Sequence, residues 1–205
     1  MPAARKRGSP EFLVYCRDAA GVGERLMTLA SRHWDYMDRF AGQLIARGPT
    51  LSPDGEEHKG SVHVVSLGSA AEAQRFAEEE PFRRAGLYAE VAIARFENLL
   101  GRTMWDRPPA SAPQLSTFLL ARWPAVPLAS DGLRALHGAV SSQPDLWAFL
   151  GLLVSDDGNL CVGAAASADV ASEPAESALR AILAPLGLER TPIETSRWRR
   201  GGRHR

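Results

Sequence analysis

The sequence is poor in cysteine and has no long apolar segment, and both absences narrow the class of protein. Its two cysteines, Cys16 and Cys161, stand far apart in apolar runs, with no CxxC pair and no cysteine–histidine cluster. This argues against a zinc site, and two buried free thiols suit a reducing compartment. The longest apolar run, LWAFLGLLV, is shorter than the about 20 residues of a membrane-spanning helix. A secretory signal requires an apolar segment after its basic residues, and no such segment follows the basic N-terminus here. We therefore expect a soluble, cytoplasmic protein without a membrane partner.

The 205-residue chain also lacks net charge, since 24 basic residues balance 24 acidic ones. A nucleic-acid partner is therefore not expected. Basic residues nevertheless gather at both ends, in the tails 1–10 and 200–205 and in the arginines just before the second tail. Such tails are usually solvated and disordered, although contact with an anionic partner is the alternative.

No nucleophile motif, glycine-rich phosphate loop or metal-ligand cluster occurs in the sequence. We expect neither a metal nor a cofactor. If the protein is an enzyme, the chemistry left to it is proton transfer by acid and base side chains.

The expected elements follow the order β-α-β-β-α-β twice, which is the ferredoxin-like α+β pattern. In the first half the sequence predicts a strand at 11–17, a helix from about 22 to 46, a short strand around 44–51, a strand at 61–67, a helix interrupted at Pro81 and a strand at 88–100. A proline-rich linker is expected at 105–114. After it come a strand at 116–122, a helix capped by Ser130, two strands joined at Asp157-Gly158, a helix closed by Gly187 and a last strand.

Landmarks in the two halves recur at offsets of 103 to 105 residues. The pairs are Arg17 with Arg122, His33 with His137, Asp54-Gly55 with Asp157-Gly158, and Pro81 with Pro185. A common offset with a common element order indicates a ferredoxin-like module duplicated in tandem. The domains would be 11–104 and 115–199, packed against each other as a pseudo-dimer within one chain. Two unrelated halves of the same topology are the alternative, and further homo-oligomerisation stays open.

His33 stands among apolar residues spaced three and four apart, on one face of the first expected helix. Those residues are Leu26, Ala30, Met37, Ala41 and Leu44. An imidazole on a covered face is either a satisfied core group or a working one, and the pattern alone favours the first. Trp34 and Trp147 are expected in the core rather than as cofactor platforms.

Residues 11–100 resemble the YCII-related family. The resemblance is carried by FLVYCRD, RHWDYMDRF, RGP, GSVHVV and EEEPFRRAGLYAEVAIARFE. The family implies a ferredoxin-like fold that usually dimerises, similar to the muconolactone isomerase type of dimeric α/β barrel. It also implies a histidine–aspartate pair in a pocket, and most members have no known substrate.

Carried over to this chain, the histidine of that pair is His33 and the acid is Glu80, where the family more often has aspartate. A carboxylate would fix the tautomer of the imidazole and raise its basicity. In the second half Ala184 stands in place of the acid. We therefore expect a competent site in the first half and a degenerate copy, with His137, kept for packing.

Four further residues are candidates for substrate binding. Ser61 and His63 share one strand face and would line the same pocket, although a surface pair is an equal alternative. Gly48 and Pro49 match the family's GP and would shape the pocket wall, or else form an ordinary turn.

The sequence thus favours a small-molecule enzyme of the lyase or isomerase type, acting on a small organic acid or lactone through a His–Glu acid/base pair. A non-catalytic small-molecule-binding or regulatory module that uses the same pocket is the alternative. A purely structural role ranks third.

Overall fold

A computed structural model of the chain describes residues 8–107 and 116–202. The first half contains β1 (Glu11–Asp18), α1 (Gly23–Asp38), β2 (Leu44–Leu51), β3 (His58–Ser66), α2 (Ala70–Glu78), α3 (Pro81–Arg84) and β4 (Tyr88–Asn98). After the 3₁₀ turn η1 (Met104–Asp106), the second half contains β5 (Ser116–Pro127), α4 (Ser130–Ser141), η2 (Pro144–Leu146), β6 (Trp147–Val154), β7 (Leu160–Ala168), α5 (Ser172–Leu183), η3 (Ala184–Leu186) and β8 (Ile193–Trp198). The order β-α-β-β-α-β therefore occurs in both halves.

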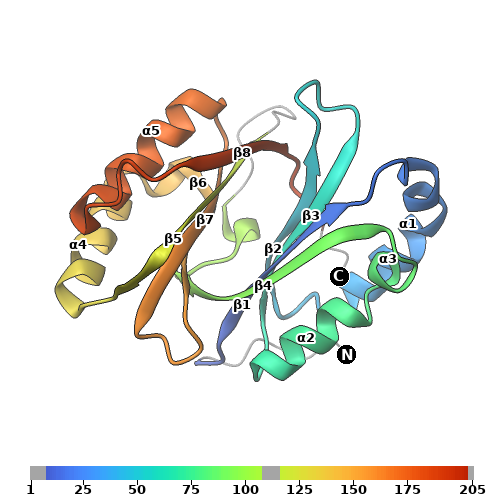
Figure 1. Cartoon of the computed structure of the whole chain (residues 1–205), viewed down its shortest axis with the longest axis horizontal. Helices are drawn as coiled ribbons and strands as arrows, with labels where there is room; N and C mark the ends of the chain where they lie inside the picture. Colours follow the sequence, from blue (N-terminus) through green and yellow to red (C-terminus); the bar gives the residue numbers. More distant parts are fainter. Residues whose placement is uncertain (1–7, 108–115, 203–205) are drawn as a thin grey trace.

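The eight strands form one closed antiparallel barrel in the order β1-β3-β2-β8-β5-β7-β6-β4. Each half supplies four neighbouring strands, with its first strand between its third and its fourth. The halves are joined along two seams, where β4 pairs with β6 and β2 pairs with β8. Figure 1 shows the helices of each half outside the barrel, on opposite sides of the molecule. The result is an α+β fold in which no sheet edge is left open.

Alternation along the strands explains why three cores form. On β1, Leu13 and Tyr15 belong to the core inside the barrel, whereas Val14 and Cys16 pack under the helices of the first half. Successive strand residues point to opposite faces, so one strand serves two cores. A third core lies between the barrel and the helices of the second half. The barrel interior is filled by side chains, so a cavity for a ligand must lie elsewhere.

The expected helix over 22–46 is too long at its C-terminal end. The helix α1 ends at Asp38, and a turn in which the amide of Leu44 donates to the carbonyl of Phe40 leads directly into β2. Ala41 and Leu44 are buried as predicted, but in a turn and a strand rather than on a helix face. Spacing alone could not separate these cases, because a short apolar run fits either period.

Two other expectations differ from the structure at the ends of the elements. Ser130 is the first residue of α4 rather than its cap. The expected linker 105–114 falls mostly outside the described residues, but Trp105 lies in η1 and packs against two of the cores.

The second basic tail is not solvated where the structure describes it. Arg200 donates to the carboxylate of Asp169 at 2.7 Å and to the carbonyls of Met104 and Arg107. Its charge is thus used inside the fold, which composition alone could not show. Residues 1–7 and 203–205 lie outside the described part of the chain.

No helix within 8–107 and 116–202 is long and apolar enough to span a membrane.

Candidate active site

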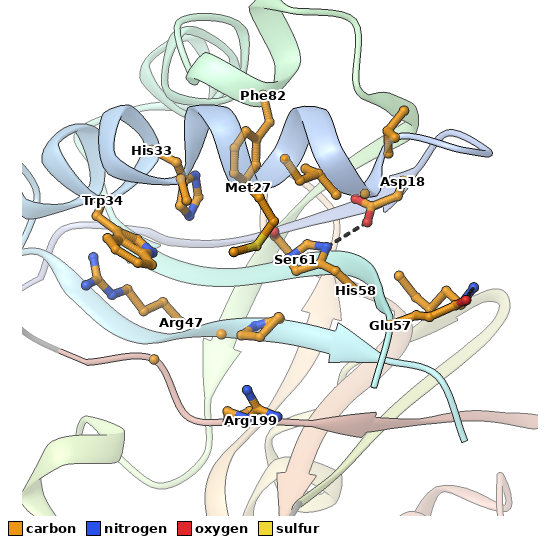
Figure 2. Close-up of a pocket in the computed structure, with 18 of the residues that line it drawn as sticks. Asp18, Met27, His33, Trp34, Arg47, Glu57, His58, Ser61, Phe82 and Arg199 are labelled. Atoms are coloured by element: carbon orange, nitrogen blue, oxygen red, sulfur yellow. Dashed lines mark hydrogen bonds and ion pairs between the residues drawn. The ribbon is translucent and has the colours of Figure 1, made fainter. Parts of the chain in front are cut away.

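A cavity of about 800 Å³ opens in the first half, between the helices α1 and α3 on one side and the strands β2 and β3 on the other. Figure 2 shows His33 and Phe82 reaching into it from the helices and Arg47, His58 and Ser61 from the strands. The chain that follows β8 borders the same cavity through Arg199. The second half therefore completes a site whose other walls come from the first half.

His33 lies on α1 and is held by two contacts. Its ring stacks on that of Phe82, with centroids 4.5 Å apart and planes inclined by 3°. Its Nδ1 lies 2.7 Å from Oε1 of Glu80. An ionised carboxylate can only accept, so Nδ1–H donates and Nε2 is left with a lone pair. Because His33 also lines the cavity, this is the arrangement of a general base with a fixed tautomer.

Glu80 is itself held in place by the start of α3. Its Oε2 accepts a hydrogen bond of 2.9 Å from the amide of Arg83, which makes Glu80 the N-cap of that helix. Pro81 follows at the first helical position, where a missing amide hydrogen costs nothing. With its side chain only 3% exposed, the carboxylate has one oxygen committed to the helix and the other to His33.

Ser61 and His63 are both buried on β3 and both line the cavity. The hydroxyl of Ser61 accepts a hydrogen bond of 3.3 Å from Tyr88, so its own proton can point elsewhere. The Nδ1 of His63 is buried and has no partner among the described residues. Burial is the main cause that holds the pKa of His63 well below 6.5, and the electrostatic influence of the nearby His33, Arg47 and His58 lowers it further.

This lowered pKa predicts an acid-labile fold. The unfolded chain binds a proton at His63 near pH 6.5, whereas the folded chain stays neutral there, so the free energy of unfolding should fall as the pH drops below 6.5. One such proton contributes a slope of about 1.4 kcal/mol per pH unit. Chemical denaturation at several pH values should show this slope reduced in His63→Leu. The exposed-site variant His137→Leu is the control and should keep it, and an unchanged slope in His63→Leu would contradict the assignment.

Gly48 and Pro49 lie within β2 and form part of the cavity wall. Gly48 is required by a close approach: a Cβ there would lie 2.0 Å from the carbonyl oxygen of Arg199. The carbonyl of Pro49 accepts the amide of Arg199 at 3.2 Å. The GP pair therefore brings the chain after β8 against the cavity rather than forming a turn.

Several cavity residues have no counterpart among the sequence candidates. His58 donates to Asp18, with Nδ1 2.6 Å from Oδ2, and both border the cavity. Arg47 is buried and pairs with Asp38 at 3.2 Å. Trp34, expected in the core, is 55% exposed at the cavity, whereas Trp147 is fully buried as expected. Asp18 on the first strand and Arg199 near the C-terminus are far apart in the sequence, and nothing in their spacing predicts that both border one cavity.

Among the described residues of the second half, 116–202, no comparable imidazole–carboxylate pair is found. His137 is exposed on α4, and its Nδ1–H donates to the carbonyl of Leu133 one turn earlier. Ala184, at the position expected to match Glu80, begins η3. His137 therefore contributes little to packing, contrary to the sequence hypothesis.

Solved structures similar to this one share the barrel. A chlorite dismutase from Candidatus Nitrospira defluvii has a TM-score of 0.56 at 9% identity, over 93% of this chain and 92% of that one. A protein from Lactobacillus acidophilus, described as a monooxygenase, has a TM-score of 0.53 at 8% identity, over 94% of each chain. At these identities the likeness concerns the fold alone.

A shorter match covers 42% of this chain and 93% of 5-chloro-2-hydroxyhydroquinone dehydrochlorinase from Burkholderia phenoliruptrix, at 27% identity and a TM-score of 0.40. No curated protein sequence matches the chain. The model of the YCII-related domain matches residues 11–97, which confirms the resemblance of the N-terminal part. The matched residues of this YCII-related domain include His33, His58 and His63 of the cavity.

Proposed function

We propose that the protein is a small-molecule enzyme of the lyase or isomerase type, in which His33 and Glu80 form the acid/base pair. The observation that carries the proposal is the 2.7 Å hydrogen bond from Nδ1 of His33 to a buried carboxylate, on a ring that also lines a cavity. Nε2 would accept a proton from a carbon next to a carbonyl group. The nearby carboxylate stabilises the imidazolium that forms.

The substrate class is a small organic acid or lactone. Arg47 and Arg199 border the cavity and offer positive charge to a carboxylate or to the oxyanion of an enolate. Ser61 and His63 supply polar atoms deeper in the cavity, while Gly48 and Pro49 shape its wall. The hydroxyl of Ser61 accepts from Tyr88, so its own proton is available to a ligand.

We also propose that the chain arose by duplication of one module. Domains 11–104 and 115–199 would be two ferredoxin-like copies that form a pseudo-dimer, the second without a working pair. Their equal strand order and their two equivalent seams support this view. Residues after 199 pack on the first domain, since the amide of Gly201 donates to the carbonyl of Arg47.

The test uses two probes that isomerise by proton transfer alone, α-angelica lactone and 3-butenoate. A proton leaves the carbon next to the carbonyl group, the double bond moves into conjugation, and a proton is added at the γ carbon. Proton NMR in D₂O follows both deuterium uptake and product. The full-length protein should accelerate both for at least one probe.

Absence of both reactions with both probes would overturn the proposed activity toward this class. If a probe then still raises the melting temperature, the non-catalytic binding module is the better description of the cavity.

A further inference from the structure

A second imidazole–carboxylate pair borders the cavity, opposite the first. The Nδ1 of His58 lies 2.6 Å from Oδ2 of Asp18, and both residues line the cavity. The side chain of Asp18 is 5% exposed and that of His58 is 29% exposed. As in the His33–Glu80 pair, a buried carboxylate accepts from Nδ1, so Nε2 on the other side of the ring is left to the cavity.

The two pairs come from different layers of the fold. His33 and Glu80 belong to the helical side, whereas Asp18 ends β1 and His58 begins β3. A register shift between Arg17 and Asp18 in the pairing of β1 with β4 breaks the regular alternation at this point. Figure 2 shows His33 above the cavity and His58 below it, tied to Asp18.

The ring of Phe82 lies close to both imidazoles. It stacks on His33 at 4.5 Å and meets His58 edge-on at 6.5 Å, centroid to centroid. The two imidazole centroids are therefore no more than about 11 Å apart, the sum of those two distances. A small ligand can span such a gap, with one end at each ring. Both imidazoles are also near enough to His63 to lower its pKa.

The second half shows that the barrel does not need this polar pair. Arg17 pairs with Gly60 in the first half, and Arg122 pairs with Gly163 in the second. Trp123, next after Arg122, thus corresponds to Asp18, and Cys161, two before Gly163, corresponds to His58.

There the indole nitrogen of Trp123 donates to the carbonyl of Cys161 at 3.1 Å, and both side chains are buried. Two buried side chains and one hydrogen bond to a backbone carbonyl thus complete the same place in the fold, without an imidazole or a carboxylate. The half that lacks the Asp18–His58 pair is also the half that lacks a counterpart of Glu80.

We propose that Asp18 and His58 form a second acid/base pair, which delivers a proton to a ligand at the end away from His33. This rests on the proposed function and deepens it. Nε2 of His58 first takes up a proton from solvent. His33 takes the proton from the carbon next to the carbonyl group, the electron pair of that C–H bond becomes the new double bond, and the old double bond accepts the proton of Nε2 of His58 at the γ carbon. His33 then returns its proton to solvent, so both rings end the cycle as they began it. The same pair would protonate a departing hydroxyl group in an elimination. Substrates then carry an acidic C–H bond and a proton acceptor two carbons or fewer beyond it.

The experiment separates the two steps with α-angelica lactone and 3-butenoate in D₂O. Deuterium uptake next to the carbonyl group needs only His33, whereas product formation needs both pairs. In His58→Gln and in the isosteric Asp18→Asn, we expect uptake to continue near the wild-type rate and product to form about 10²-fold more slowly. In His33→Gln both should fall. Thermal denaturation checks that each variant is folded. If His58→Gln does not fold, Asp18→Asn alone tests the inference.

The outcomes distinguish the two proposals. An unchanged ratio of product to uptake in both variants of the second pair would overturn this inference while leaving the role of His33 intact. Absence of both reactions in the wild type, or their survival in His33→Gln, would overturn the proposed function and this inference with it.

Nitrogen NMR of the wild-type protein gives a second readout that does not depend on turnover. With crotonate, the product of 3-butenoate, as the probe, the Nε2 signals of His33 and His58 should both shift. Movement of the His33 signal alone, or of neither, would argue that the second pair only ties β1 to β3.

Discussion

Replacing His33 with alanine should lower the rate of proton transfer by about 10²–10⁴-fold, the usual contribution of a positioned acid/base group. The same replacement at His137 should leave the rate unchanged. The two residues stand 104 positions apart, the offset of the proposed repeat, but of the two only His33 lines the cavity and meets a carboxylate. Proton NMR measures the isomerisation rate of each variant with whichever probe the wild-type protein converts.

Stability separates the two variants as well. His33→Ala leaves the buried carboxylate of Glu80 with one oxygen unpaired, which should cost about 1–3 kcal/mol of unfolding free energy. His137→Ala removes an exposed side chain bonded only within its own helix, so its effect should stay within about 0.5 kcal/mol. Equal loss of activity in the two variants would mean that the halves share the chemistry, and the assignment of the site to the first half would be wrong.

Much of the fold could be predicted from the sequence because the strands alternate and the turns use strong residues. Asp157-Gly158 joins β6 to β7, and Gly158 has a φ of +78°, which glycine adopts without strain. The end of α1 could not be predicted, since apolar residues continue past Asp38 at spacings that suit a helix. The closing of the barrel depends on pairing between β4 and β6 and between β2 and β8, contacts that leave no local pattern.

The candidate site could be predicted only in part, for a related reason. His33 and Glu80 are 47 residues apart, and they were paired through the family resemblance rather than through spacing; the structure brings them to 2.7 Å. The approach of Arg199 to the cavity depends on the path of the chain after β8, which local sequence does not encode. Asp18 and His58 lie on two adjacent strands, and only the register places one beside the other.

Replacing Glu80 with glutamine should lower the rate about as much as removing His33, by about 10²–10⁴-fold, with little loss of stability. One carboxylate oxygen of Glu80 already accepts the amide of Arg83. In the glutamine variant the amide oxygen keeps that hydrogen bond, so the NH₂ group faces Nδ1 of His33. Nδ1 must then accept, which places the proton on Nε2 and leaves no lone pair toward the cavity. Nitrogen NMR of His33 should report this change of tautomer directly.

Glu80→Ala gives the complementary result, a loss of both activity and stability. It removes the N-cap of α3, worth about 1 kcal/mol, and leaves Nδ1–H of His33 without its acceptor, which adds about 1–3 kcal/mol. Ser69→Ala is the matched control, because Ser69 caps α2 by accepting the amide of Glu72 and does not border the cavity. It should cost about 1 kcal/mol in chemical denaturation and leave the rate unchanged. A glutamine variant with full activity would mean that Glu80 serves only to begin α3, and that His33 works without a carboxylate partner.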